Sequence, residues 1–177
     1  MNYATIKWRD IANGPGIRLS VFVSGCRHHC KGCFNPETWS FSYGEEYTKE
    51  VEDQILDFLG KSYIKGLSLL GGEPFEPENQ PYMLSLTTRA KELYPEKTIW
   101  CYSGYTLDQD ILPGNLGDKE ITHALIRNID VLVDGEFHEE EKDLSLRFRG
   151  SRNQRIIDVR ETLKTGNIVL WEDREEF

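Results

Sequence analysis

Short apolar strands alternate along this chain with amphipathic helices, and this alternation constrains the fold more than any other feature. The strand segments are β-branched or continuously apolar, as expected of strands that are covered on both faces. We expect strands at residues 17–24, 66–70, 98–102 and 130–133, helices at 48–59, 81–93 and 118–127, and two last strands at 155–159 and 167–171. Strands that alternate with helices favour an α/β fold with a mostly parallel sheet.

The composition is that of one globular unit. The chain has 177 residues and contains no internal repeat or linker that would divide it, so we expect a single domain over residues 1–177. Its 21 basic and 30 acidic side chains give a net charge of -9, which argues against a nucleic-acid partner. The longest apolar run, residues 168–171, is far shorter than a membrane span, and the first eight residues lack the pattern of a signal peptide. We therefore expect no membrane association and a cytoplasmic location.

Three of the four cysteines, Cys26, Cys30 and Cys33, lie within eight residues. Clustered thiols in a reducing compartment favour metal binding over disulfides, and thiolates suit iron–sulfur clusters or zinc. Three ligands would leave one iron of a four-iron cluster open to a substrate, whereas zinc would need a fourth ligand such as a nearby histidine or Cys101. The spacing favours the cluster, and Cys101, which lies inside an expected strand, is interpreted as a small buried apolar residue.

Glycine, cysteine and polar residues follow four of the expected strands. Cys26 follows the first, 71–73 (Gly-Gly-Glu) the second, 103–104 (Ser-Gly) the third and 134–135 (Asp-Gly) the fourth. In open parallel sheets ligands bind outside the carboxyl ends of the strands. The sequence therefore predicts that these four pieces form one shared site.

The spacing C-x3-C-x2-C resembles the signature of the radical S-adenosylmethionine enzymes. Other segments narrow the resemblance to activases of glycyl-radical enzymes, and among these to the activators of anaerobic ribonucleoside-triphosphate reductases. The segments are 13–18, 71–74, 102–106, 131–135 and 148–155. Five motifs in order, together with the cysteine spacing, make the resemblance specific, and it covers essentially the whole chain.

This resemblance implies a truncated β/α barrel with two cofactors. A [4Fe-4S] cluster would be held by Cys26, Cys30 and Cys33, and S-adenosylmethionine would bind its open iron. The residues it assigns to S-adenosylmethionine are Gly32, Phe34, Gly71, Gly72, Glu73, Ser103 and Asp134. The 71–73 turn would line the methionine moiety and Gly32 and Phe34 the adenine, with Phe34 replacing the aromatic residue that many relatives carry at the position of Gly32.

The resemblance also implies the reaction and the partners. A reduced cluster would cleave S-adenosylmethionine to methionine and a 5'-deoxyadenosyl radical, which takes a hydrogen atom from a glycine in the C-terminal loop of the reductase. A flavodoxin or ferredoxin would supply the electron. Two alternatives remain, an activase of another glycyl-radical enzyme such as pyruvate formate-lyase, and a zinc-stabilised interaction module.

The polar stretch at 135–155 is long for a simple connection. We expect it to help receive the glycine-bearing loop of the partner, with Arg149 and Arg152 in contact with it. Its acidic residues 139–141 and its arginines could instead pair with each other.

Overall fold

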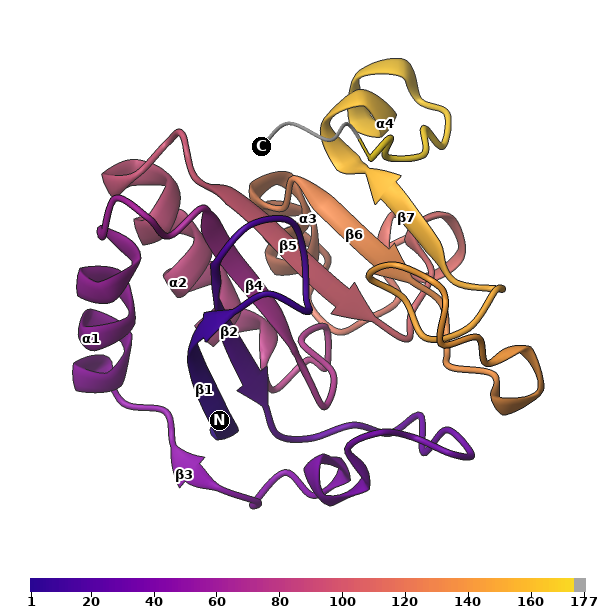
Figure 1. Cartoon of the computed structure of the whole chain (residues 1–177), viewed down its shortest axis with the longest axis horizontal. Coiled ribbons are helices and arrows are strands. Elements are labelled where there is room, and N and C mark those ends of the chain that lie inside the picture. Colours follow the sequence, from indigo (N-terminus) through magenta and orange to yellow (C-terminus); the bar gives the residue numbers. More distant parts are fainter. Residues whose placement is uncertain (174–177) are drawn as a thin grey trace.

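The computed structural model describes residues 1–173 and arranges them around one seven-stranded sheet (Figure 1). The strands are β1 (Asn2–Asp10), β2 (Arg18–Val23), β3 (Glu45–Glu46), β4 (Gly66–Gly71), β5 (Thr98–Ser103), β6 (Val131–Asp134) and β7 (Arg155–Asp158). Their order across the sheet is β3-β1-β2-β4-β5-β6-β7. The four central strands β2, β4, β5 and β6 are parallel, and β1 and β7 flank them antiparallel. The expected α/β fold with a parallel centre is confirmed.

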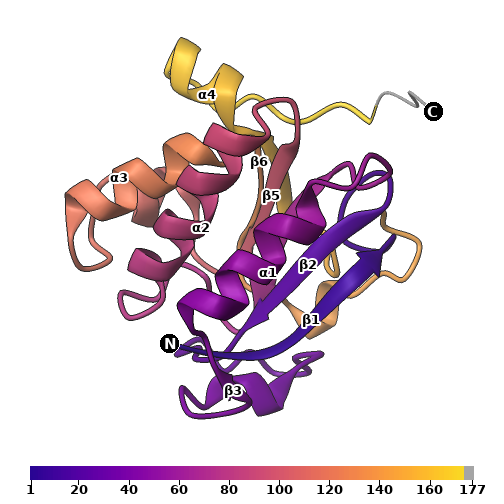
Figure 2. The same cartoon turned by 90° about the vertical axis from the view of Figure 1, so that its left-hand side faces the viewer.

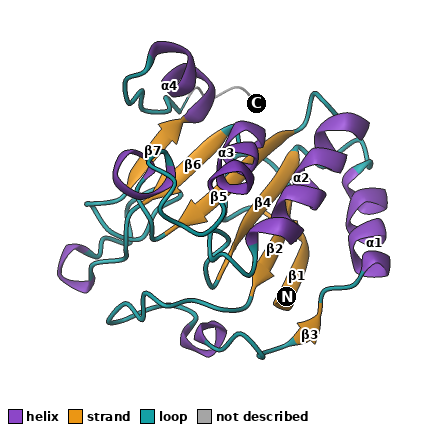
Figure 3. Ribbon diagram, turned by 180° about the vertical axis from the view of Figure 1, so that it is seen from behind, coloured by secondary structure: helices purple, strands orange, loops and turns teal. Residues whose placement is uncertain are grey.

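Helices cover one face of this sheet. Within residues 1–173 the α-helices are α1 (Lys49–Leu59), α2 (Gln80–Leu93), α3 (Lys119–Asn128) and α4 (Val159–Thr165). The single turns η1 (Pro36–Trp39), η2 (Leu107–Ile111) and η3 (Glu139–Glu141) lie in the loops between these elements. Figures 2 and 3 show α1, α2 and α3 on the same side of the strands. Thr48 and Asp118 cap α1 and α3, because their side-chain oxygens accept hydrogen bonds from main-chain N–H groups of the first turn.

The two faces of the sheet serve different purposes. Leu19, Val21 and Val23 of β2 are fully buried and belong to the core shared with the helices. The alternate residue Phe22 points to the opposite face, where it lines a cavity with Tyr102 of β5. The helix-free face of the sheet is therefore the floor of a cavity.

The edges of the sheet differ from the sequence-based expectation. β1 was not expected, and it pairs antiparallel with β2. The prediction of a strand at 167–171 is wrong, because this segment makes a single bridge, from Leu170 to Ile157. The chain turns into α4 first, because the Asp158 side chain caps that helix and Gly166, at φ 76°, ends it in the left-handed region.

No helix in residues 1–173 combines the length and the apolar character that a membrane crossing requires.

Candidate functional site

A cavity of about 610 Å³ opens where the parallel strands β2, β4 and β5 end. The residues around it come from the ends of these strands and from the segments that follow them. They include Cys26, Cys30, Cys33, Gly71, Gly72 and Ser103. Gly104 and Gly135 line it too, so all four strand-end pieces reach one cavity, as the topology of a parallel sheet requires.

The three thiols are presented by one segment, residues 26–35, which we call the cysteine loop. The Cys26 N–H donates to the Trp39 carbonyl at 3.1 Å, which fixes the start of the loop. Further along, the Cys33 N–H donates to the Cys30 carbonyl at 3.1 Å, and Gly32 makes this turn possible with φ 76°. All three cysteines are free, and Cys26 is buried.

The donor set fits an iron–sulfur cluster. Among residues 1–173 no three His, Cys, Asp or Glu side chains are close enough to share a single metal ion. A four-iron cluster binds each thiolate through a different iron, so three thiols on one loop around one cavity suit it. Burial raises the pKa of Cys26 to about 12 and also raises the pKa of Cys30. Iron binding must therefore displace protons from these two sulfur atoms.

Gly71 and Gly72 let the turn after β4 pass directly against the backbone that carries Cys26. A Cβ at Gly71, which has φ 108°, would lie 2.6 Å from the Val23 nitrogen. A Cβ at Gly72 would lie 2.6 Å from the Gly25 carbonyl oxygen. The Glu73 N–H donates to that same carbonyl at 2.8 Å. Both glycines face the cavity, and both are also required by the packing of the chain itself.

The Glu73 carboxylate joins the ends of β4 and β5 and does not line the cavity. It is 0% exposed and accepts hydrogen bonds from the Ser103 hydroxyl at 2.9 and 3.0 Å and from the Gly104 N–H at 2.7 Å. It also accepts from the Phe75 N–H at 2.8 Å and contacts His28 Nε2 at 2.9 Å. Its contact with the methionine moiety stays a prediction.

His28 is a member of the site that the sequence did not single out as such. Its Nε2 contacts Glu73 and its Nδ1 contacts Glu136, both at 2.9 Å. Burial disfavours the imidazolium, but the hydrogen bonds and charges of the two carboxylates outweigh burial and raise the pKa of His28 to about 9. The available signal was its place between the first two cysteines of the loop.

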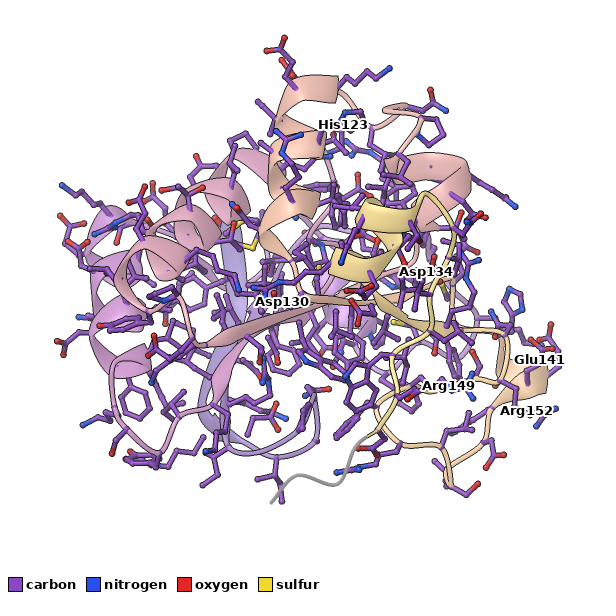
Figure 4. The ribbon with its side chains drawn as sticks, turned by 90° about the horizontal axis from the view of Figure 1, so that it is seen from above. His123, Asp130, Asp134, Glu141, Arg149 and Arg152 are labelled. Atoms are coloured by element: carbon purple, nitrogen blue, oxygen red, sulfur yellow. The ribbon has the colours of Figure 1, made fainter. Side chains whose placement is uncertain are left out.

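Asp134 is turned away from the cavity. It is buried, and its oxygens accept from Arg155 at 2.6 and 2.9 Å and from the Leu107 N–H at 2.8 Å. Figure 4 places it at the end of β6. The residue fastens β7 and η2 to β6, and its role toward a cofactor stays a prediction.

The similarities of the chain to known proteins agree with this geometry. A family model described as a 4Fe-4S single cluster domain matches residues 12–157. The "Anaerobic ribonucleoside-triphosphate reductase-activating protein" of Vibrio cholerae is 48% identical to it, over 88% of this chain and 97% of the relative. The proteins of the same name from Escherichia coli K12 and Enterobacteria phage T4 are 43% and 39% identical, over 90% and 88% of this chain and 100% and 93% of the relatives. The chain belongs to the family of anaerobic ribonucleoside-triphosphate reductase-activating proteins.

In this member of the activating-protein family, the two residues expected at the adenine lie in different surroundings. Phe34 lines the cavity, is 58% exposed and packs against Phe137 with 5.0 Å between ring centroids. Gly32 does not line the cavity, and a Cβ there would meet a Glu139 carboxylate oxygen at 3.0 Å. Of the two, Phe34 is the one placed to contact a ligand.

The 135–155 stretch forms part of the wall of the cavity, where Phe137, Phe148 and Arg149 line it. Two of its acidic residues have their side-chain partners outside the arginine-rich residues 147–155. Glu139 contacts Lys31 at 3.6 Å, and Glu141 contacts His138 at 3.2 Å. Arg149 donates instead to the main-chain carbonyls of Arg152 and Gln154, at 3.1 and 2.5 Å. Figure 4 shows Glu141, Arg149 and Arg152 on this stretch, where Arg152 is exposed.

Proposed function

We propose that this chain activates an anaerobic ribonucleoside-triphosphate reductase by reductive cleavage of S-adenosylmethionine at a [4Fe-4S] cluster. The observation that carries the proposal is that Cys26, Cys30 and Cys33 share one cavity with the Gly71–Gly72 turn at the carboxyl edge of the parallel strands. The names of the relatives support the activation of such a reductase. The chain would then be a radical S-adenosylmethionine oxidoreductase, built as one domain with a truncated β/α barrel.

The one cavity would hold both cofactors. When bound and reduced, the cluster would supply the electron for the cleavage of S-adenosylmethionine to methionine and a 5'-deoxyadenosyl radical, which would take a hydrogen atom from a glycine of the reductase. Cys26, Cys30 and Cys33 hold the cluster in this proposal. The residues proposed for the S-adenosylmethionine site are Gly32, Phe34, Gly71, Gly72, Glu73, Ser103 and Asp134. Gly32, Glu73 and Asp134 do not line the cavity, so they would act through the turn and the strand ends that they hold in place.

The residues of the chain position groups rather than transfer protons. Transfer of a hydrogen atom needs neither a general base nor a nucleophile. The buried floor formed by Phe22 and Leu70 keeps water from one side of the cavity. The proposed partners are the C-terminal glycyl-radical loop of the reductase and a flavodoxin or ferredoxin, without nucleic acid or membrane, and the proposed location is the cytoplasm.

Anaerobic purification and three assays test this function. We expect about four iron and four sulfide atoms per chain, formation of methionine and 5'-deoxyadenosine under chemical reduction, and a glycyl radical on the reductase by electron paramagnetic resonance. Zinc without sulfide would refute the proposal. A glycyl radical formed on pyruvate formate-lyase and not on the reductase would reject the proposed partner.

A further inference from the structure

We propose that Arg27 is a positioning residue. Through its contact with the buried carboxylate of Glu76, it keeps the cysteine loop aligned with the Gly71–Glu73 turn. The inference rests on the proposed function and extends it to a contact outside the cavity. It concerns the alignment of two binding elements, the loop that carries the thiols and the turn that would receive the methionine moiety.

The main-chain hydrogen bonds that fix the start of the cysteine loop run to η1 and end at Cys26. Gly25 and Cys26 are bonded to the carbonyls of Thr38 and Trp39. From residue 27 to residue 35 the main-chain hydrogen bonds between described residues run from Cys33 to Cys30 and from Thr38 to Asn35, and so remain local. Side chains must therefore hold the loop against the rest of the protein.

Arg27, directly after Cys26, supplies such a contact twice over. Its main-chain N–H donates to Glu76 Oε1 at 2.9 Å, and its Nη1 donates to Glu76 Oε2 at 2.5 Å. The same Nη1 also donates to Glu78 Oε2 at 2.9 Å, and Nη2 donates to Glu78 Oε1 at 2.5 Å. The guanidinium also lies 4.6 Å from the centre of the Phe41 ring.

The Glu76 carboxylate makes this contact specific, because it is 0% exposed. A buried carboxylate requires a partner charge, and losing that partner leaves it uncompensated. Its other side-chain contact is the Tyr105 hydroxyl at 3.4 Å. The main-chain carbonyl of Glu76 accepts from Asn79 and Gln80 at the start of α2, so the carboxylate sits on a rigid turn.

Glu78 provides a matched control on the same guanidinium. Its side chain is 48% exposed and that of Arg27 is 54% exposed, so this pair is screened by water. Glu76→Gln and Glu78→Gln therefore each remove one carboxylate charge from the partners of the same guanidinium. Only the first change acts on the buried partner.

The experiment compares these variants with Arg27→Met and Arg27→Lys in the full chain. Hydrogen exchange of residues 27–35, measured before iron is added, should become faster in Glu76→Gln and Arg27→Met and stay unchanged in Glu78→Gln. After anaerobic reconstitution, iron and sulfide contents should stay near wild type because the three thiols are untouched. Titration of the electron paramagnetic resonance signal of the reduced cluster with S-adenosylmethionine should then need about tenfold more cofactor in Glu76→Gln and Arg27→Met, and less than twofold more in Glu78→Gln.

In Arg27→Lys, the exchange rate of residues 27–35 and the amount of S-adenosylmethionine needed in the titration should lie between those of wild type and of Arg27→Met. Lysine offers a point charge in place of the planar guanidinium with its several N–H donors. Wild-type titration in Glu76→Gln, or equal weakening in Glu78→Gln, would overturn the inference. If Glu76→Gln does not fold, wild-type exchange and titration in a folded Arg27→Met would overturn it equally. A wild-type protein that holds zinc, or whose cluster signal does not respond to S-adenosylmethionine, would reject the proposed function itself, which is a distinguishable result.

Discussion

Replacing Gly72 by alanine tests how closely the turn after β4 approaches the backbone that carries Cys26. The new Cβ would lie 2.6 Å from the Gly25 carbonyl oxygen and 2.9 Å from the Thr38 carbonyl oxygen, whereas ordinary contacts begin near 3.4 Å. Both neighbours are main-chain atoms, so the two segments must separate by several tenths of an ångström. Overpacking of this kind costs about 1–3 kcal/mol, which corresponds to a Tm lower by roughly 2–12 °C in a chain of this size.

Thermal unfolding followed by circular dichroism, with and without iron, measures this cost. Gly150→Ala is the matched control, because its Cβ would meet ring carbons of Phe34 and Phe137 at 3.1 and 3.2 Å. These are side chains at the cavity wall that can shift, so we expect a loss below about 1 kcal/mol. The iron content of Gly72→Ala should also fall, since the strain acts next to Cys26. An unchanged Tm in Gly72→Ala, or an equal loss in both variants, would refute the reasoning.

Three further predictions concern the thiols, the sheet edge and the wall of the cavity. Cys30→Ala should lose the cluster and Cys101→Ala, at a fully buried core position, should keep it; iron and sulfide analysis decides, and cluster retained in Cys30→Ala would contradict the assignment. Arg155→Ala should lower the free energy of unfolding in urea by about 2 kcal/mol, because the buried Asp134 loses its charged partner; an unchanged midpoint would show that this pair contributes nothing. Arg152→Ala should slow glycyl-radical formation on the reductase while cleavage of S-adenosylmethionine alone stays near normal, and equal loss of both activities would remove the arginine from the partner surface.

The central strands could be predicted because their sequences carry two constraints at once. β2 and β4 are covered on both faces, so nearly every residue in them is buried. Short runs with apolar residues on both faces are typical of central parallel strands. The position of the site followed from the same topology, because the ends of parallel strands meet at one edge.

The edge of the sheet was less predictable, although β1 carries a usable signal. Thr5, Lys7 and Arg9 are exposed and alternate with the partly buried Ile6 and Trp8, which is the period-two pattern of a half-covered strand. At the other edge, apolar character at 167–171 indicated a strand. The structure uses that character differently, because Trp171 packs on Trp100 of β5.

The partners of the buried charges could not be predicted from the sequence. Glu73 and Asp134 were expected at a ligand because each follows a strand. Their bonds run to Ser103 and Arg155, which lie 30 and 21 residues further along the chain. No local pattern encodes such pairs, since they depend on how strands and loops come together in space.

Trp39 stacks on His29 of the cysteine loop, so the fluorescence of Trp39 can report on changes in this loop. The two rings are 4.5 Å apart and inclined by 11°, and Trp39 borders the cavity that holds the thiols. Two of the other three tryptophans, Trp100 and Trp171, pack against each other at 4.9 Å. Because iron–sulfur clusters absorb light at the wavelengths of tryptophan emission, Trp39 should be quenched as the cluster forms beside it. The difference in fluorescence between wild type and Trp39→Phe would then follow assembly of the metal centre continuously, in a sealed cuvette and without chemical sampling.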